Sequence, residues 1–155
     1  MKKEFLERAV NLAIENVASH KGGPFGAVIV KDGKIIAEGV NRVTDDCDPT
    51  AHAEIQAIRA AAKALKDFHL EGCEIYSSCE PCPMCFSAIY WAHLDCVYFA
   101  AEARDAAWAG FDDAFIYEEL NKGPEKRKIP FKKIELVEAK RPFEAWLADP
   151  ERNEY

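Results

Sequence analysis

Residues 27–39 read Ala-Val-Ile-Val-Lys-Asp-Gly-Lys-Ile-Ile-Ala-Glu-Gly, two runs rich in β-branched residues on either side of an Asp-Gly pair. Asp-Gly between such runs is typical of a two-residue hairpin turn, because both turn positions need a positive φ that aspartate and glycine tolerate. We therefore predict a β-hairpin with strands at residues 27–31 and 34–39.

Three segments around the hairpin have the composition and periodicity of helices. Residues 3–19 place apolar side chains three and four positions apart, which is helical spacing. Residues 51–65 are rich in alanine, and Thr50 stands where a side chain could cap the first turn of that helix. Residues 83–92 follow a proline-rich turn, and Pro83 suits the first turn because no helical partner is needed for an N–H there.

Further strands alternate with these helices along the chain. Residues 73–77, 96–101 and 134–138 are short runs that predict strands, and residues 142–147 predict a short closing helix. The run at 96–101 is wholly apolar, which indicates a strand covered on both faces. The order of these elements predicts the α/β class: a three-layer α/β/α sandwich with a mixed five-stranded sheet, formed by one domain over residues 1–155.

The composition is that of a globular protein, and it disfavours some classes of binding partner. The 155 residues are 49% apolar and 30% charged, with a net charge of −7 and a pI near 5.2. This acidic balance disfavours a nucleic-acid partner, because binding to phosphates draws heavily on Lys and Arg. The sequence shows no apolar run of 18 residues and no apolar leader, so we expect no membrane partner and a cytoplasmic location.

Two short motifs place metal-binding side chains at the starts of predicted helices. His-Ala-Glu occupies residues 52–54, and Pro-Cys-Pro-Met-Cys occupies residues 81–85. Cys82 and Cys85 are three positions apart, so one helical turn can present both sulfurs to one ion, and the helix dipole favours thiolate there. With an imidazole nitrogen from His52, the donor set is one nitrogen and two sulfurs, which suits one Zn²⁺ per chain.

Three protein ligands predict a catalytic zinc site, because a structural site is normally closed by four. An open position holds a water molecule, whose pKa the ion lowers so that hydroxide is available at neutral pH. Two thiolates offset the charge of the ion, so a nearby carboxylate is needed to take the proton. Glu54 can do so and can return the proton to a ring nitrogen and a departing amine. His-x-Glu followed by Pro-Cys-x-x-Cys is the signature of zinc-dependent deaminases.

Cys79 leaves an alternative open, because Cys79 and Cys82 form a second Cys-x-x-Cys pair. As a fourth ligand, Cys79 would close the site, and the chain would be a zinc-stabilised scaffold without catalysis. We favour a buried thiol near the site, because a closed site leaves Glu54 without a role.

Several sequence blocks outside the metal motifs indicate a particular family. They are Gly-Gly-Pro-Phe-Gly-Ala at residues 22–27, Ser-Cys-Glu at 78–80, Ala-Ile-Tyr-Trp-Ala at 88–92, Ala-Gly-Phe-Asp-Asp-Ala-Phe-Ile-Tyr at 109–117 and Asn-Glu-Tyr at 153–155. With the metal motifs, the chain resembles the cytidine deaminase-like superfamily and, within it, the bacterial guanine deaminases over nearly its whole length. The Phe-Asp-Asp block and the terminal tyrosine carry the distinction within the superfamily.

The resemblance implies a reaction, a site and an assembly. Such enzymes hydrolyse guanine to xanthine and ammonia, with Asp113 as a second acid beside Glu54. The implied substrate contacts come from the side chain of Asn41, the backbone of Ala53, the aromatic walls Phe25 and Trp91, and a closing Tyr155. The resemblance also implies a homodimer with exchanged C-terminal segments, which would bring Asp113 and Tyr155 to the site of the partner.

Other interpretations of these residues stay open. Phe25 and Trp91 could belong to the core, Asn41 could only stabilise a turn, and Asp113 could cap a helix. The substrate could be guanosine or another base, or adenosine in tRNA. A tRNA substrate requires an open pocket with a basic rim for the polyanion, which the charge of −7 disfavours.

Overall fold

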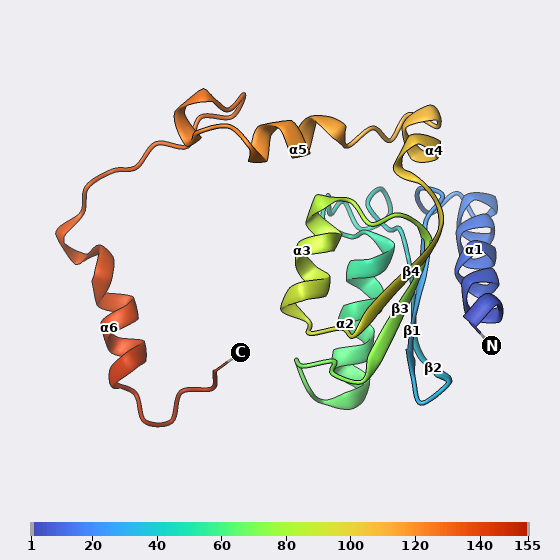
Figure 1. Ribbon diagram of the computed structural model, residues 1–155, viewed down its shortest axis with the longest axis horizontal. Helices are drawn as coiled ribbons and strands as arrows, with labels where there is room; N and C mark the ends of the chain where they lie inside the picture. Colours follow the sequence, from blue (N-terminus) through green and yellow to red (C-terminus); the bar gives the residue numbers. More distant parts are fainter. Residues whose placement is uncertain (1, 155) are drawn as a thin grey trace. The chain divides into compact units, whose positions relative to one another are not determined.

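The computed structural model describes residues 2–154, and its contacts divide the chain into two compact units that meet in sequence after Asp113. The first contains α1 (Lys2–Ala18), β1 (Gly26–Lys31), β2 (Lys34–Val40), α2 (Ala53–Leu65), β3 (Cys73–Cys79), α3 (Pro83–Trp91), β4 (Cys96–Ala101) and α4 (Ala103–Trp108) (Figure 1). The second contains α5 (Ala114–Leu120), the 3-10 turns η1 (Pro124–Lys126) and η2 (Val137–Lys140), and α6 (Arg141–Ala148). Within residues 2–154, no helix has both the length and the apolar character needed to span a membrane.

The predicted hairpin is confirmed. Strands β1 and β2 pair antiparallel, with Gly26 opposite Val40 at one end and Lys31 opposite Lys34 at the other. The two residues between the strands, Asp32 and Gly33, have φ angles of 50° and 71°, so both adopt the left-handed conformation that this turn requires.

The sheet is mixed, as predicted, but it has four strands in the described part of the chain rather than five. Its order is β2-β1-β3-β4, with β3 antiparallel to β1 and parallel to β4. The predicted strand at residues 134–138 is irregular chain that leads into η2, and Ile134 is 85% exposed. Its sequence pattern satisfies a strand, but a strand also needs a neighbour to pair its backbone, and this segment pairs with none.

Strand β4 corrects a second expectation. Its wholly apolar sequence predicted burial on both faces, yet β4 is the edge strand and its residues are half-buried or exposed. An apolar run reports which residues could be buried, whereas strand order decides how many neighbours a strand has.

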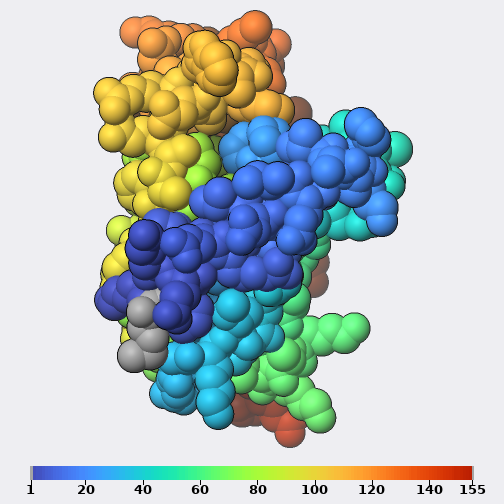
Figure 2. Space-filling view, turned by 90° about the vertical axis from the view of Figure 1, so that its right-hand side faces the viewer, coloured from blue at the N-terminus to red at the C-terminus, as the bar shows by residue number. Residues whose placement is uncertain are grey.

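Side chains alternate along the strands and build two cores, one on each face of the sheet. Ile75 of β3 packs with Ala57 of α2 and Ile89 of α3. On the other face, Tyr76 packs with Leu12 of α1. Helix α1 therefore covers one face and α2 and α3 cover the other, which gives the three predicted layers (Figure 1). The space-filling view shows α1 lying across its face (Figure 2).

The start of α2 differs from the prediction in a way that matters for the site. The helix begins at Ala53, and His52 occupies the N-cap position without a side-chain cap hydrogen bond. Thr50 is not the cap, because its hydroxyl donates to Asp48 Oδ1 at 2.7 Å. The His52 imidazole at this helix start is therefore not used to satisfy helix amides.

Gly39 of β2 brings α2 close to the sheet. A methyl group at residue 39 would lie 2.2 Å from the carbonyl oxygen of Ala53 and 2.5 Å from the amide nitrogen of Ala57. Both atoms are backbone, so the clash can be relieved only by moving the helix that carries His52 and Glu54.

We expect Gly39→Ala to lower the free energy of unfolding by about 1–3 kcal/mol, because overpacking moves the backbone of α2. Urea denaturation measures this change. Gly23→Ala is the matched control, since a methyl group there meets no atom closer than 3.4 Å. Equal stabilities of the two variants would show that α2 does not depend on close approach at Gly39.

Candidate active site

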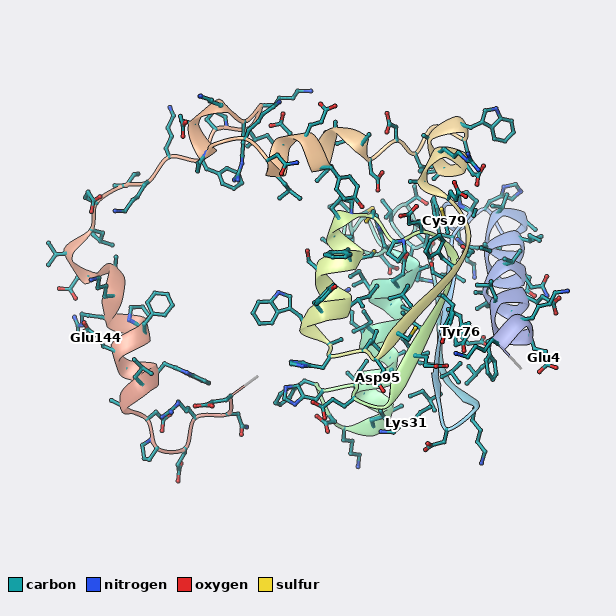
Figure 3. All side chains as sticks on the ribbon, in the orientation of Figure 1. Glu4, Lys31, Tyr76, Cys79, Asp95 and Glu144 are labelled. Atoms are coloured by element: carbon teal, nitrogen blue, oxygen red, sulfur yellow. The ribbon has the colours of Figure 1, made fainter. Side chains whose placement is uncertain are left out.

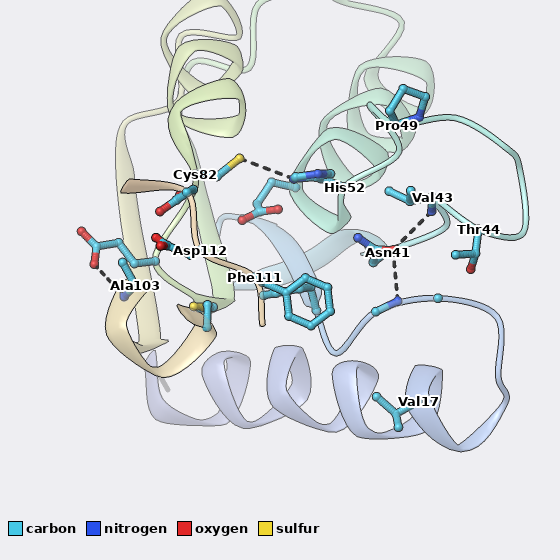
Figure 4. Close-up of a pocket in the computed structure, with 18 of the residues that line it drawn as sticks. Val17, Asn41, Val43, Thr44, Pro49, His52, Cys82, Ala103, Phe111 and Asp112 are labelled. Atoms are coloured by element: carbon cyan, nitrogen blue, oxygen red, sulfur yellow. Dashed lines mark hydrogen bonds between the residues drawn. The ribbon is translucent and has the colours of Figure 1, made fainter. Parts of the chain in front are cut away.

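A cavity of about 650 Å³ opens in the first unit, beside the start of α2 and the start of α3 (Figure 4). Its wall combines charged, sulfur-bearing and aromatic side chains. They include Phe25, Asn41, His52, Glu54, Cys79, Glu80, Cys82, Phe111, Asp112 and Asp113. The cavity therefore joins the predicted metal ligands to several of the residues predicted to contact substrate.

The predicted metal ligands converge. The Nδ1 atom of His52 lies 3.4 Å from Cys82 Sγ and 3.5 Å from Cys85 Sγ. The ligand atoms of these three residues all lie within 4.8 Å of one another. His52 is the N-cap residue of α2, Cys82 is the N-cap residue of α3, and Cys85 lies in the first turn of α3.

These separations fit a zinc ion. Tetrahedral geometry with Zn–N near 2.0 Å and Zn–S near 2.3 Å places nitrogen and sulfur about 3.5 Å apart. The three residues can therefore hold one zinc ion with little rearrangement. Three ligands leave a fourth tetrahedral position, which is the arrangement of catalytic zinc sites.

The protonation equilibria also favour a cation between these side chains. The Cys85 thiol and the His52 imidazole lower the pKa of Cys82 to about 4, so Cys82 is a thiolate at neutral pH. The hydrogen bond with Cys82 raises the pKa of His52. The pKa of Cys85 is raised, because the neighbouring Cys82 thiolate and burial both oppose a second negative charge. A divalent cation relieves this opposition, since it neutralises both sulfurs at once.

Glu54 lies on the first turn of α2, beside the three predicted metal ligands. Its side chain is 5% exposed, and burial raises the pKa of its carboxyl group. Its Oε1 atom accepts a hydrogen bond from Ser77 Oγ at 3.1 Å, and its Oε2 atom accepts one from Cys85 Sγ at 3.3 Å. A carboxyl group with a raised pKa next to a predicted metal site has the properties of a general base and acid.

Cys79 is not part of the group of residues that could hold a metal ion. It ends β3, next to the chain that leads into α4, and its Sγ atom donates to the Glu102 carbonyl oxygen at 3.6 Å (Figure 3). Burial raises the pKa of this thiol to about 11, so it remains protonated. Both observations favour the buried-thiol interpretation over a fourth metal ligand.

Asn41 is buried and rigidly oriented at the cavity wall. Its Oδ1 atom accepts hydrogen bonds from the amides of Gly23 at 3.1 Å and Val43 at 3.2 Å (Figure 4). Fixing the oxygen directs the side-chain NH₂ group to the side of the cavity that holds His52 (Figure 4). The two interpretations of Asn41 are thus compatible: its side-chain oxygen can stabilise the turn while its NH₂ group contacts a substrate.

Phe25 forms an aromatic wall with Phe111, for which the sequence analysis predicted no role. Its ring packs edge to face on Phe111, with centroids 5.1 Å apart and an interplanar angle of 87°. Phe111 belongs to the Phe-Asp-Asp block, but no pattern in the sequence shows that it packs against a residue 86 positions earlier. A planar apolar-faced ligand suits such a wall.

The remaining predicted residues are distributed differently. Asp113 lines the cavity of its own chain, and burial raises the pKa of its carboxyl group. Ala53 is fully buried and does not line the cavity among the described residues. Trp91 ends α3, is 67% exposed and does not line the cavity among the described residues. Tyr155 lies outside the described residues.

Comparisons with known proteins agree with this geometry. Residues 1–101 match the cytidine and deoxycytidylate deaminase zinc-binding region. The chain is 58% identical over 151 residues to a guanine deaminase of Bacillus subtilis, covering 97% of each chain. The crystal structure of guanine deaminase from Bacillus subtilis superposes with a TM-score of 0.97, covering 99% of this chain and 98% of that one at 57% identity.

More distant relatives match a smaller part of the chain. A structure of guanine deaminase from Nitrosomonas europaea is 34% identical with a TM-score of 0.66, covering 70% of this chain and 63% of that one. A tRNA-specific adenosine deaminase of Aquifex aeolicus is 47% identical over 78 residues, which are 50% of this chain and 52% of that protein. The sequence shared with this tRNA deaminase is therefore about half of the chain.

The position of Cys79 predicts different zinc contents for two single-cysteine variants. Cys82→Ser should reduce bound zinc well below one ion per chain, because a neutral hydroxyl replaces a thiolate ligand. Cys79→Ser should retain one ion per chain. Elemental analysis of the purified proteins measures the zinc content. Comparable zinc loss in the two variants would place Cys79 in the metal site.

Proposed function

The chain belongs to the zinc-binding cytidine and deoxycytidylate deaminase family, and we propose that it hydrolyses guanine to xanthine and ammonia. The observation that carries this proposal is buried Glu54 beside the convergent His52, Cys82 and Cys85 at the cavity wall. The near full-length similarity to a guanine deaminase supports guanine as the base.

The proposed chemistry divides between the metal and the carboxyl group. His52, Cys82 and Cys85 would hold the zinc ion, which would supply a Lewis acid that lowers the pKa of a water molecule. Glu54 takes a proton from the attacking water and delivers it to a ring nitrogen of guanine. It then transfers the proton of the newly formed hydroxyl group to the departing amine, so that the carbonyl forms as the carbon–nitrogen bond breaks. Burial supports the first transfer, because it raises the pKa of the Glu54 carboxyl group and so makes the carboxylate a stronger base toward water; the proton is then held on Glu54 until a more basic substrate nitrogen takes it. The products are xanthine and ammonia, which together account for guanine and one water.

The proposed substrate contacts follow from the cavity wall. Phe25, supported by Phe111, packs on the apolar face of the purine, while the Asn41 amide hydrogen-bonds its edge. Asp113 acts as a second acid at the ring edge. Three further contacts rest on the resemblance alone: the backbone of Ala53, the ring of Trp91 and a closing Tyr155.

We further propose a homodimer with exchanged C-terminal segments. None of the described residues from Ala114 to Glu154 is buried, although the segment includes large apolar side chains such as Phe131, Leu136 and Phe143. A segment that buries no core of its own is stabilised when a second surface covers it. We place the dimer in the cytoplasm, where the six cysteines of each chain, all free thiols in this structure, stay reduced.

The substrate prediction is tested by ammonia release from guanine, guanosine, cytosine, adenine and tRNA. We expect guanine to be the preferred substrate, because the cavity wall fits a bare purine and the chain carries a net charge of −7. Preferred turnover of adenosine in tRNA would instead support the alternative function, that of a tRNA adenosine deaminase. An enzyme of that class is similar to half of this chain.

Glu54→Gln should retain zinc and the wild-type thermal midpoint but lose turnover by at least about 100-fold, because only proton transfer is removed. Ammonia release, zinc content and thermal unfolding measured on one preparation separate these effects. Turnover near the wild-type rate would eliminate Glu54 as the proton carrier.

Removal of Tyr155 should lower kcat/KM by about tenfold, the equivalent of one lost hydrogen bond or stacking contact, with little change in thermal midpoint. Steady-state kinetics and thermal unfolding of the truncated chain check this expectation. Unchanged kinetics would reject the proposed closing role of the terminal residue.

A further inference from the structure

Ser77 is a buried polar residue outside the metal motifs. It lies in β3, its side chain is only 2% exposed, and its hydroxyl donates to Glu54 Oε1 at 3.1 Å. A hydroxyl group buried this deeply needs a hydrogen-bond partner, and in this structure the partner is the proposed proton carrier.

The alternation of side chains along β3 explains why Ser77 reaches Glu54. Ile75 packs in the core on the side of α2 and α3, and Ser77 is two residues further along the same face. Ser78 points to the other face, where its hydroxyl accepts a hydrogen bond from the Gly26 amide at 3.0 Å. Two adjacent buried serines therefore have different tasks, one toward Glu54 and one toward the backbone of β1.

The two oxygens of Glu54 have partners of different kinds. Oε2 accepts from Cys85 Sγ at 3.3 Å, so this oxygen lies on the side of the predicted metal ligands. Oε1 accepts from Ser77, which is not one of those ligands. Ser77 therefore holds the oxygen that does not contact the metal ligands, and Oε2 is left on the side where the reaction is proposed to occur.

We infer that Ser77 is a positioning residue, which anchors one oxygen of Glu54 so that the other is held for proton transfer. This inference rests on the proposed deaminase function. Anchoring matters because a carboxylate can rotate, and proton transfer needs it within hydrogen-bond reach of water and base together. Ser77 does not line the cavity, so it acts on the reaction through Glu54 and not by contact with substrate.

Kinetics of three variants on guanine test the inference. Ser77→Ala should lower kcat roughly 10- to 100-fold, the range expected for losing a hydrogen bond to a charged group, with KM and zinc content unchanged. Ser77→Thr keeps the hydroxyl on a residue that suits strands, so it should recover most of the wild-type kcat. Ser78→Ala is the matched control: it should destabilise the fold through the unpaired Gly26 amide while kcat stays near wild type.

A double-mutant cycle between Ser77→Ala and Glu54→Ala adds a readout other than activity. If the two side chains interact, their effects on the thermal midpoint should be non-additive, whereas Ser78→Ala and Glu54→Ala should be additive. Wild-type kcat in Ser77→Ala, or additivity in the first cycle, would overturn the inference. Failure of the wild-type protein to release ammonia from guanine would instead overturn the proposed function, and the stability cycle would still decide whether Ser77 holds Glu54.

Discussion

The convergence of two helix starts on one face of the sheet is the constraint on which the site depends. His52 and Cys82 are the N-cap residues of α2 and α3, both in extended conformation, and neither makes a side-chain cap hydrogen bond. These positions usually stabilise helices by satisfying the first amides, so both helices give up that contribution to direct a metal ligand into the cavity. Packing supplies the compensation, through small alanines of α2 and close contact with Gly39.

A second set of buried polar groups holds the substrate side of the cavity in place. The Asn16 amide of α1 donates to the carbonyl oxygens of Gly23 at 2.9 Å and Asn41 at 2.8 Å. Gly22 passes so close that a methyl group there would lie 2.0 Å from the Asn41 carbonyl oxygen. Helix α1 therefore does more than cover the sheet: it fixes the loop whose Asn41 side chain faces the cavity.

The sequence was sufficient for features that depend on local pattern. The Asp32-Gly33 turn, helices α1, α2, α3 and α6, and the grouping of His52, Cys82 and Cys85 follow from residue spacing, because each is decided within one or two turns of chain or by the chemistry of one ion. Contacts between segments that are distant in the chain could not be predicted from the sequence. The contact of Phe111 with Phe25, the hydroxyl of Ser77 at Glu54 and the turn of Cys79 toward Glu102 all depend on packing between distant segments. The edge position of β4 and the unpaired segment at 134–138 were missed because apolar sequence does not specify a neighbour.

The central claim is a metal held by one imidazole and two thiolates, with its fourth position open beside Glu54. X-ray absorption at the zinc edge of the loaded protein tests this claim most directly, because it counts sulfur neighbours. The account predicts two sulfurs at about 2.3 Å and two lighter neighbours at about 2.0 Å. Three sulfur neighbours would contradict it, because Cys79 would then close the position that the proposed reaction requires.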